Sequence, residues 1–368
     1  MKLILYFSAL LILLLSCKQP ESKAALKPVG ETTYQVGYEP RWTHYFKDKE
    51  QEYVAFGEFE TFKTIKIFNV YGKNIYTLSL NDFTKTNGVI LEDFFMVNLD
   101  TIALLAKNNL IFLLDNKGTL LRKMDYSKYI VEGIGLKSPL YIQNNIIRCG
   151  IAYNDFGNPI TMDYKYYHDF FVRNDLFYQL MIDTIKTNPE KELQPVFMLD
   201  SLFTRFIPKD HFHVESTKIT FTEKENIYQS NYTDSVYHYD LNGHLKQIHT
   251  IKSNYFNTKL TPVSVRENYK NNRAFQENIY NGGYISKLLW DNTKELYYCT
   301  VIGKWSPETR DNIPFSIIVL DKNFNKLDEF LMDEQMYQVI MFVNKNGLNI
   351  LTNKSTFKQK IYTTLRYE

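Results

Sequence analysis

Asn-Leu-Ile-Phe-Leu-Leu-Asp-Asn-Lys-Gly-Thr-Leu-Leu-Arg-Lys-Met, residues 109–124, is the stretch that decides the fold class of this chain. An apolar run ends at Asp115, a turn closes at Gly118, and a second run alternates after it. Asp favours the start of a tight turn because its side chain accepts a hydrogen bond from the backbone two residues on, and Gly adopts positive φ without steric cost. The stretch therefore predicts a β-hairpin.

The same unit returns at residues 235–251 and 315–331, with a looser copy at 65–80. Asp115, Asp240 and Asp321 are 125 and 81 residues apart, close to multiples of the roughly 40–45 residues of a propeller blade. One hairpin cannot bury its own apolar face, so the copies must stack. We therefore predict an all-β fold, a six-bladed β-propeller; seven blades and a β-sandwich with recurrent tight turns are the alternatives.

The predicted strands also indicate how the ring closes. The last set, at residues 338–343, 348–352 and 360–366, has three strands, whereas the sets before it at 217–251 and 284–331 have four. A lone strand predicted at Thr32–Tyr38 would supply the missing one, so we expect the N-terminal strand to close the last blade. We expect residues 188–209 to form a long connection.

Composition supports one large β domain. Aromatic residues make up 15% of the chain, with 28 Tyr and 26 Phe, and such usage favours strands. No linker rich in Pro, Gly or Ser divides the body, which predicts a single propeller domain at residues 31–368.

The N-terminus reads as an export signal. Leu3–Leu15 is apolar but shorter than the roughly 20 residues that span a bilayer. The following Leu14-Leu15-Ser16-Cys17 resembles the bacterial lipoprotein signal box, which implies removal of residues 1–16 and acylation of Cys17. Residues 17–30 would carry the lipidated cysteine and a flexible tether. The alternative is a plain secretory signal with an incidental cysteine.

Lys18, rather than Asp, follows the cysteine, so the usual inner-membrane retention signal is absent. We expect an outer-membrane lipoprotein, periplasmic or surface-exposed, whose partners are the membrane through its lipid anchor and an envelope protein or oligosaccharide. Loss of Lys2 with the leader lowers the net charge from +2 to +1, which excludes the basic footprint of a nucleic-acid-binding protein. Cys149 and Cys299 lie in apolar runs, and we expect two separate buried thiols rather than a disulfide.

Two groups of residues are candidate binding sites. The densest aromatic cluster contains Tyr164, Tyr166 and Tyr167, and a second loop contains Trp305 and Arg310. Aromatic faces stack on sugars or on partner side chains, so both groups are ligand-binding candidates. The alternative is that these rings cover blade edges or fill the space between blades.

Histidines give a third candidate. Alternation along a strand would place His211 and His213 on one face, where they could share a metal. Solvated histidines of a polar loop are the alternative, and we predict neither a metal nor a cofactor. His238 and His244 flank a blade turn and are expected in solvent.

The chain lacks a Gly-x-Ser-x-Gly elbow, a phosphate-binding Gly-rich loop and an Asp-x-Asx-x-Asx-Gly calcium loop. We therefore predict no catalytic residue.

A family resemblance rests on the lipobox and on spaced motifs, which are residues 98–118, 250–255, 290–298 and 314–321. Together they resemble a family of uncharacterised Bacteroidota lipoproteins with a TolB-like six-bladed β-propeller fold. The resemblance implies six blades and adds no activity. We expect a membrane-anchored binding or scaffolding module of the cell envelope. The alternative is a hydrolase or lyase whose site is assembled from several blades at the axial pocket.

Overall fold

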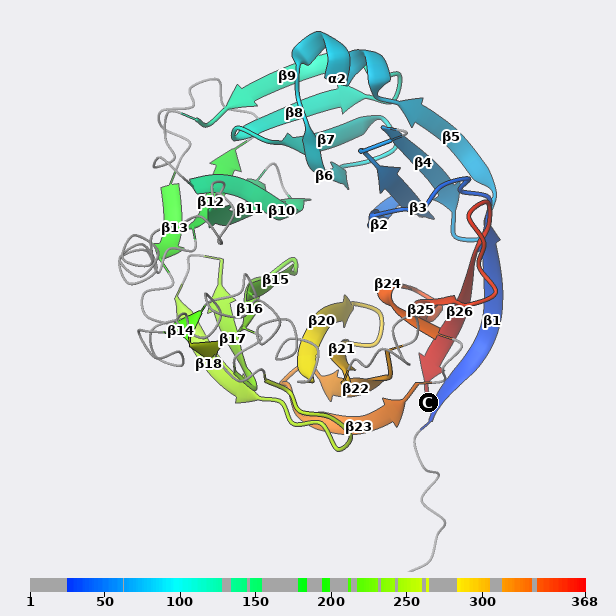
Figure 1. Ribbon diagram of the computed structural model, residues 1–368, viewed down its shortest axis with the longest axis vertical. Coiled ribbons are helices and arrows are strands. Elements are labelled where there is room, and N and C mark those ends of the chain that lie inside the picture. Colours follow the sequence, from blue (N-terminus) through cyan, green and yellow to red (C-terminus); the bar gives the residue numbers. More distant parts are fainter. Residues whose placement is uncertain are drawn as a thin grey trace, which may run out of the picture.

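The computed structural model describes residues 25–61, 63–127, 134–143, 146–153, 178–183, 194–198, 211–212, 217–230, 233–241, 244–259, 263–264, 283–304, 313–332 and 336–368. Their strands form a β-propeller, with four-stranded antiparallel sheets placed one after another around a central axis (Figure 1). Within the described part of the chain there are six such sheets and one two-stranded sheet.

The first three sheets follow chain order from the axis outward. The first contains β2 (Trp42–Asp48), β3 (Gln51–Glu58), β4 (Thr64–Asn69) and β5 (Asn74–Ser79). The second contains β6 (Leu91–Met96), β7 (Thr101–Ala106), β8 (Leu110–Asp115) and β9 (Leu120–Asp125). The third contains β10 (Ile134–Gln143), β11 (Ile146–Tyr153), β12 (Tyr178–Asp183) and β13 (Gln194–Met198). The third is the least regular, because β11 and β12 pair through only two residue pairs.

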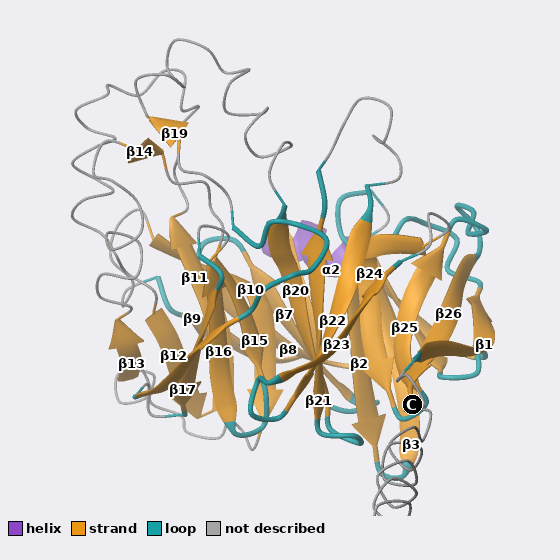
Figure 2. Cartoon of the chain, turned by 90° about the horizontal axis from the view of Figure 1, so that it is seen from below, coloured by secondary structure: helices purple, strands orange, loops and turns teal. Residues whose placement is uncertain are grey.

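The remaining sheets complete the ring. The fourth contains β15 (Thr217–Phe221), β16 (Glu225–Ser230), β17 (Ser235–Asp240) and β18 (Leu245–Thr250). The fifth contains β20 (Tyr284–Asp291), β21 (Leu296–Ile302), β22 (Phe315–Asp321) and β23 (Lys326–Leu331). The sixth contains β24 (Met336–Asn344), β25 (Gly347–Thr352), β26 (Lys360–Tyr367) and β1 (Leu26–Tyr34). Strands β14 (His211–Phe212) and β19 (Val263–Ser264) pair with each other beyond one face of the ring (Figure 2).

The innermost strands contact one another around the whole ring. β2 contacts β6, β6 contacts β10, and β10 contacts β15; β15 then contacts β20, β20 contacts β24, and β24 returns to β2. The chain termini complete this closure, because β1 pairs antiparallel with β26. The predicted closure of the last sheet by an N-terminal strand is therefore confirmed. The strand begins at Leu26 rather than Thr32, so residues 26–30, which we expected in the tether, belong to the sheet.

The predicted turn chemistry is present where the hairpins close. The Asp115 carboxylate accepts hydrogen bonds from the Lys117 and Thr119 amides at 2.9 and 2.7 Å. Gly118 follows with φ of +85°. The equivalent position after Asp321 is Phe324 with φ of +65°, a conformation that costs a side chain with Cβ about 1–2 kcal/mol.

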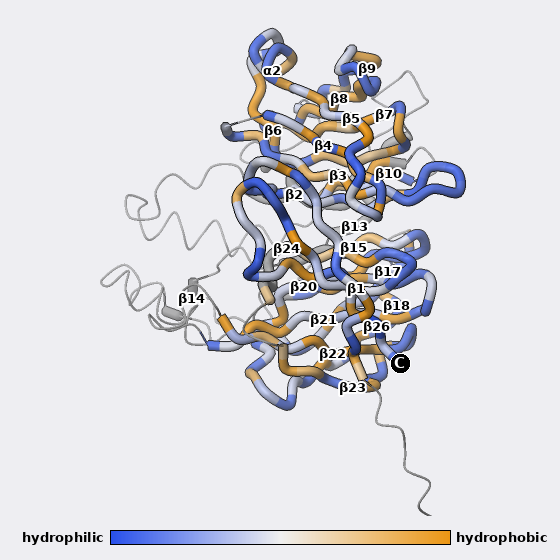
Figure 3. Tube along the Cα trace, turned by 90° about the vertical axis from the view of Figure 1, so that its right-hand side faces the viewer, coloured by the Kyte–Doolittle hydropathy of each residue, from blue (hydrophilic) through white to orange (hydrophobic). Residues whose placement is uncertain are grey.

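Burial follows the position of a strand within its sheet. The central strands β7 and β21 are buried along nearly their whole length, whereas the outermost strands β9 and β18 are largely exposed. In Figure 3 hydrophobic colour gathers in the strands and hydrophilic colour at many of the turns. The core lies between neighbouring sheets; between the sixth and first it is built of rings, including Tyr34, Phe56, Phe68 and Tyr362.

Several expectations need correction. The innermost strands β2 and β6 were not predicted, because their residues mix polar and aromatic types instead of alternating. β13, at Gln194–Met198, lies inside the stretch 188–209 that we expected to be a connection without strands. A short helix, α2 (Asn81–Asn87), follows β5 in a chain predicted to be all strand, and it ends at Gly88 with φ of +62°.

Candidate functional site: an axial cavity

Among the described residues, a wide cavity lies along the propeller axis. A cavity of about 1400 Å³ is lined by the first strand of each of the six sheets, namely β2, β6, β10, β15, β20 and β24. Sites for drug-sized ligands measure roughly 300–1,000 Å³, so this cavity has room for a larger molecule. Because the first strands have no further strand on their inner edge, their side chains form its wall.

Three half-buried rings on three different sheets contribute to this wall. They are Trp42 on β2, Tyr141 on β10 and Trp290 on β20. Each ring packs against another side chain of the protein. Phe59 stacks on Trp42 at 4.7 Å between ring centroids, and Tyr297 packs on Trp290 at 4.4 Å.

The group that packs on the Tyr141 ring is a cation, the guanidinium of Arg148. The Arg148 guanidinium lies 4.4 Å from the centroid of the Tyr141 ring and 5.1 Å from that of Phe221. Such cation–π contacts favour a fixed ring orientation. The cavity wall is therefore preorganised, since the rings are held in place before any ligand arrives.

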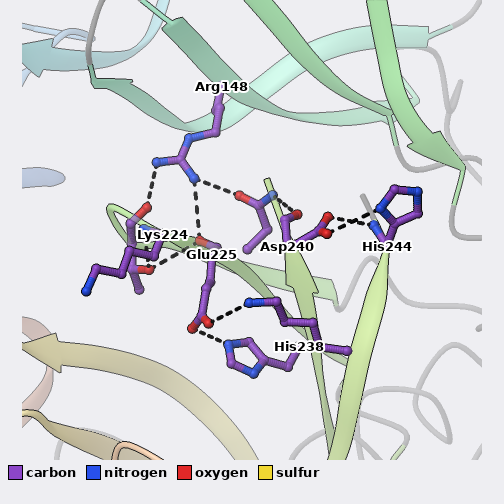
Figure 4. Close-up of polar contacts among 9 residues, drawn as sticks. Arg148, Lys224, Glu225, His238, Asp240 and His244 are labelled. Carbon is purple, nitrogen blue, oxygen red and sulfur yellow. Dashed lines mark hydrogen bonds and ion pairs between the residues drawn. The ribbon is translucent and has the colours of Figure 1, made fainter. Parts of the chain in front are cut away.

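Arg148 also joins two sheets through hydrogen bonds (Figure 4). The residue belongs to β11, yet it donates to the β15–β16 hairpin of the fourth sheet. Its Nη2 donates to the Thr222 carbonyl in the turn at 2.6 Å, and its Nη1 donates to the Asn226 side chain on β16 at 2.8 Å. Only 3% of its surface is exposed. Burial lowers the pKa of Arg148, but an arginine remains charged in proteins. The guanidinium thus couples the third and fourth sheets next to the cavity.

An acidic group lies on the opposite side of the third sheet. Asp93 on β6 is buried, and its carboxylate accepts hydrogen bonds from the Phe94 and Leu140 amides, each at 2.8 Å. Burial raises the pKa of Asp93 to about 6, against the lowering effect of these hydrogen bonds. A carboxyl group with this pKa can hold or release a proton near neutral pH.

A histidine on β2, the innermost strand that contacts β6, is neutral. The Nδ1 of His44 on β2 accepts a hydrogen bond from the Met96 amide at 3.0 Å, and its ring packs 4.2 Å from that of Phe95. Burial lowers the pKa of His44 to about 3. His44 lines the cavity and is only half-buried by surface area, but protein surrounds it, so the imidazole stays uncharged near neutral pH.

A second titratable cluster lies where the cavity meets the fourth and fifth sheets (Figure 4). Glu225 binds His238 through one carboxylate oxygen and Lys246 through the other, the latter at 3.3 Å. His249 packs 6.0 Å from His238 and stacks on Phe324 at 4.5 Å. Burial, together with the neighbouring His238, lowers the pKa of His249.

This cluster corrects one prediction and agrees with another. His238 is buried rather than solvated, because Phe324 from the neighbouring sheet packs 5.4 Å from its ring. His244 is exposed, as expected, and its amide donates to Asp240 at 2.9 Å.

The binding residues singled out from the sequence fall outside the part of the chain that the structure describes. Tyr164, Tyr166, Tyr167, Trp305 and Arg310 lie outside the described residues, as do Cys17 and His213. Only the backbone of His211, in β14, is described. These assignments stay predictions.

Three further findings bear on the sequence predictions. Among the described residues, no group of three or more His, Cys, Asp or Glu side chains could hold a metal ion. In the same residues no helix is long and apolar enough to cross a membrane. Cys149 and Cys299 are both unpaired and buried, so the expectation of two separate thiols is confirmed.

Fold and cavity together define the class of this protein: an all-β propeller with a ring-lined axial cavity. No family model matches the chain, and no curated protein does. Among solved structures, it is similar to one described as a member of the duf4221 family from Bacteroides vulgatus, with a TM-score of 0.68 at 14% identity over 94% of this chain and 98% of that one. It is also similar to one described as a putative exported protein from Bacteroides fragilis, with a TM-score of 0.55 at 9% identity over 96% and 97%. At these identities the likeness establishes the propeller fold alone.

Proposed function

We propose that the chain is an exported, lipid-anchored propeller that binds a ligand in its axial cavity, as a binding module of the cell envelope. The observation that carries this proposal is the cavity of about 1400 Å³ lined by all six innermost strands. A purely structural protein would need no such space. Pockets that bury most of a ligand and combine aromatic walls with a few placed polar groups are the usual form of a binding site.

The six four-stranded sheets are, in this proposal, six blades of a TolB-like propeller. The unbroken circuit of contacts among the innermost strands supports that number. A six-bladed ring brings six strands together at one axis, which accounts for the breadth of the cavity wall.

The proposed location is the outer membrane, on the side of the periplasm or of the cell surface. The support is the lipobox at Leu14–Cys17 and the absence of Asp after the cysteine. Since β1 begins at Leu26, the anchor would hold the propeller close to the membrane. Several acyl chains at about 0.8 kcal/mol per buried CH₂ would make this attachment stable. One of the structural neighbours is described as exported.

A second candidate function is catalysis by a hydrolase or lyase. Asp93, whose pKa burial raises to about 6, and the Glu225–His238 pair both line the cavity. Perturbed carboxyl groups in a pocket are typical of acid–base sites. Against this candidate, the Asp93 carboxylate is already engaged by two backbone amides.

The test is retention of a ligand by the folded domain. Residues 18–368 would be purified, exposed to a detergent extract of bacterial envelopes and weighed by native mass spectrometry. The matched variants are Ser286→Trp, which fills the cavity, and Ser79→Trp, which places the same side chain on the outermost strand β5. We expect a ligand mass on the wild type and on Ser79→Trp, and its loss from Ser286→Trp.

Equal retention by all three proteins, or no retained ligand, would overturn the proposal. A ligand recovered in cleaved form would favour the enzyme over the binding module. For the anchor, labelled palmitate should enter the wild type in cells and be absent from Cys17→Ser.

A further inference from the structure

The charge of the cavity wall limits what the cavity can hold. Four basic residues line it, and they are Arg41, Lys224, Lys287 and Lys322. Four acidic residues balance them, and they are Asp93, Glu223, Glu225 and Glu295. His44, which also lines the cavity, is neutral. The lining is therefore close to zero net charge.

Most of these charges are already satisfied within the protein. Glu295 pairs with Lys322 at 2.9 Å, and the Lys287 ammonium donates to the Met341 carbonyl at 3.1 Å. Arg41 forms an ion pair with Glu60.

Acidic residues of the lining are also paired within the protein. Glu225 binds His238 and Lys246, and Asp93 accepts two backbone amides. The two remaining residues, Glu223 and Lys224, are adjacent and of opposite sign. An ionic ligand would have to compete with partners already in place.

What the wall offers instead is aromatic faces interleaved with uncharged polar groups. Trp42, Tyr141 and Trp290 present supported rings from three sheets. Ser138, Ser286, Gln247 and Asn292 line the same space. Rings with electron-rich faces attract C–H groups, and hydroxyl and amide side chains donate to and accept from hydroxyl groups.

We propose that the cavity binds a neutral oligosaccharide, with sugar rings stacked on Trp42, Tyr141 and Trp290. A polyhydroxylated chain has alternating C–H faces and hydroxyl edges, which matches both kinds of lining group. It carries no charge to disturb the internal ion pairs. The cavity volume exceeds that of a site for one small ring, which suits several linked units. This inference rests on the proposed binding function and names its ligand class.

The test uses calorimetric titration of the 18–368 domain with soluble oligosaccharides of several units. The panel contains neutral gluco-, manno- and xylo-oligosaccharides, an acidic oligogalacturonate, a cationic chitosan oligomer, and a nucleoside and a short peptide as ligands without sugar chains. We expect binding of at least one neutral chain, with an affinity that is unchanged between low and high salt because no ion pair forms with the ligand.

Variants locate the site. Trp42→Ala, Tyr141→Ala and Trp290→Ala should each weaken binding by roughly 3–10-fold, since an aromatic contact contributes about 0.5–1.5 kcal/mol. Trp42→Phe should recover most of the affinity because it keeps a ring. Tyr71→Ala, which removes an exposed ring outside the cavity, is the matched control and should bind as the wild type does. Circular dichroism would verify that each variant is folded.

The outcomes separate this inference from the proposed function. Binding of only the acidic, cationic, nucleoside or peptide ligand, lost in Ser286→Trp, would overturn the neutral oligosaccharide and keep the cavity as a binding site. Sugar binding that survives all three alanine substitutions would also overturn it. A protein that retains nothing from envelope extracts and binds no panel member would overturn both.

Discussion

Replacing Arg148 with Met tests whether one guanidinium couples the third and fourth sheets. Met keeps much of the side chain over the Tyr141 ring and removes the charge and all donors. Thr222 and Asn226 would then lose their shortest contacts with the guanidinium, at 2.6 and 2.8 Å. Both residues are buried, so water cannot easily replace the lost donor.

The expected size follows from these two contacts. Hydrogen bonds to a charged group contribute about 1.5–3 kcal/mol each, which gives a gross loss of about 3–6 kcal/mol for the pair. Removing the cation also ends the cost of keeping it out of water, which offsets part of this loss. We therefore expect a net decrease of about 2–4 kcal/mol in the free energy of unfolding. Arg148→Lys, which keeps one cationic donor group, should fall between Met and the wild type.

The measurement is urea unfolding of the 18–368 domain followed by tryptophan fluorescence. The matched control is Lys123→Met, because the Lys123 ammonium also lies over a ring, 6.0 Å from Phe112, but the side chain is exposed. The control should change stability by less than about 0.5 kcal/mol. If Arg148→Met proves as mild as Lys123→Met, with the same urea dependence, the guanidinium does not hold the two sheets together and the reasoning fails.

Three further predictions concern closure, pH and thiol chemistry. Gly72→Ala should lower the urea midpoint more than Gly88→Ala. Both glycines have positive φ, but only at Gly72 would a new Cβ lie 2.3 Å from a carbonyl oxygen of β1. Equal effects of the two substitutions would contradict a tightly packed closure of the ring. Because burial raises the pKa of Asp93 to about 6 from 3.8, the folded state binds a proton that the unfolded state lacks between about pH 4 and 6, so stability falls as the pH rises through this window. Asp93→Asn should remove that fall in urea titrations at a series of pH values, and an unchanged profile would refute the assignment. Burial raises the pKa of the Cys149 and Cys299 thiols, so in a Cys17→Ser background both should resist a thiol reagent in the native protein and react in denaturant; rapid native labelling would contradict their burial.

The candidate site shows where reasoning from the sequence reached its limit. Trp42 went unnoticed because it belongs to β2, an innermost strand that was not predicted. Asp93, on the equally unpredicted β6, looks like an ordinary exposed charge beside Glu92, but the structure buries it. Such a strand faces a cavity along one edge, so polar and aromatic residues interrupt the alternation on which strand prediction depends. Trp290 lay in a motif quoted for the family resemblance, but no pattern indicated that its ring would line the axis.

His238 makes the same point about burial. It lies in β17 two residues before the turn at Asp240, and polar residues that flank a turn are typically solvated. In the structure Phe324, from a different sheet, packs on it. Phe324 itself occupies the turn position where the equivalent hairpin of the second sheet has Gly118, and only tertiary contacts explain a bulky residue at positive φ.

The amino-acid sequence by itself determined the β-propeller class, the hairpin turns at Asp115 and Asp321, the closing role of an N-terminal strand and the two unpaired thiols. These features depend on interactions between residues close in the chain, or on strand composition, and such interactions leave a readable pattern. Tertiary structure alone decided which side chains line the axial cavity, how Arg148 joins two sheets and why His238 is buried. Each of those features depends on contacts between residues of different sheets, and no local sequence pattern predicts such contacts.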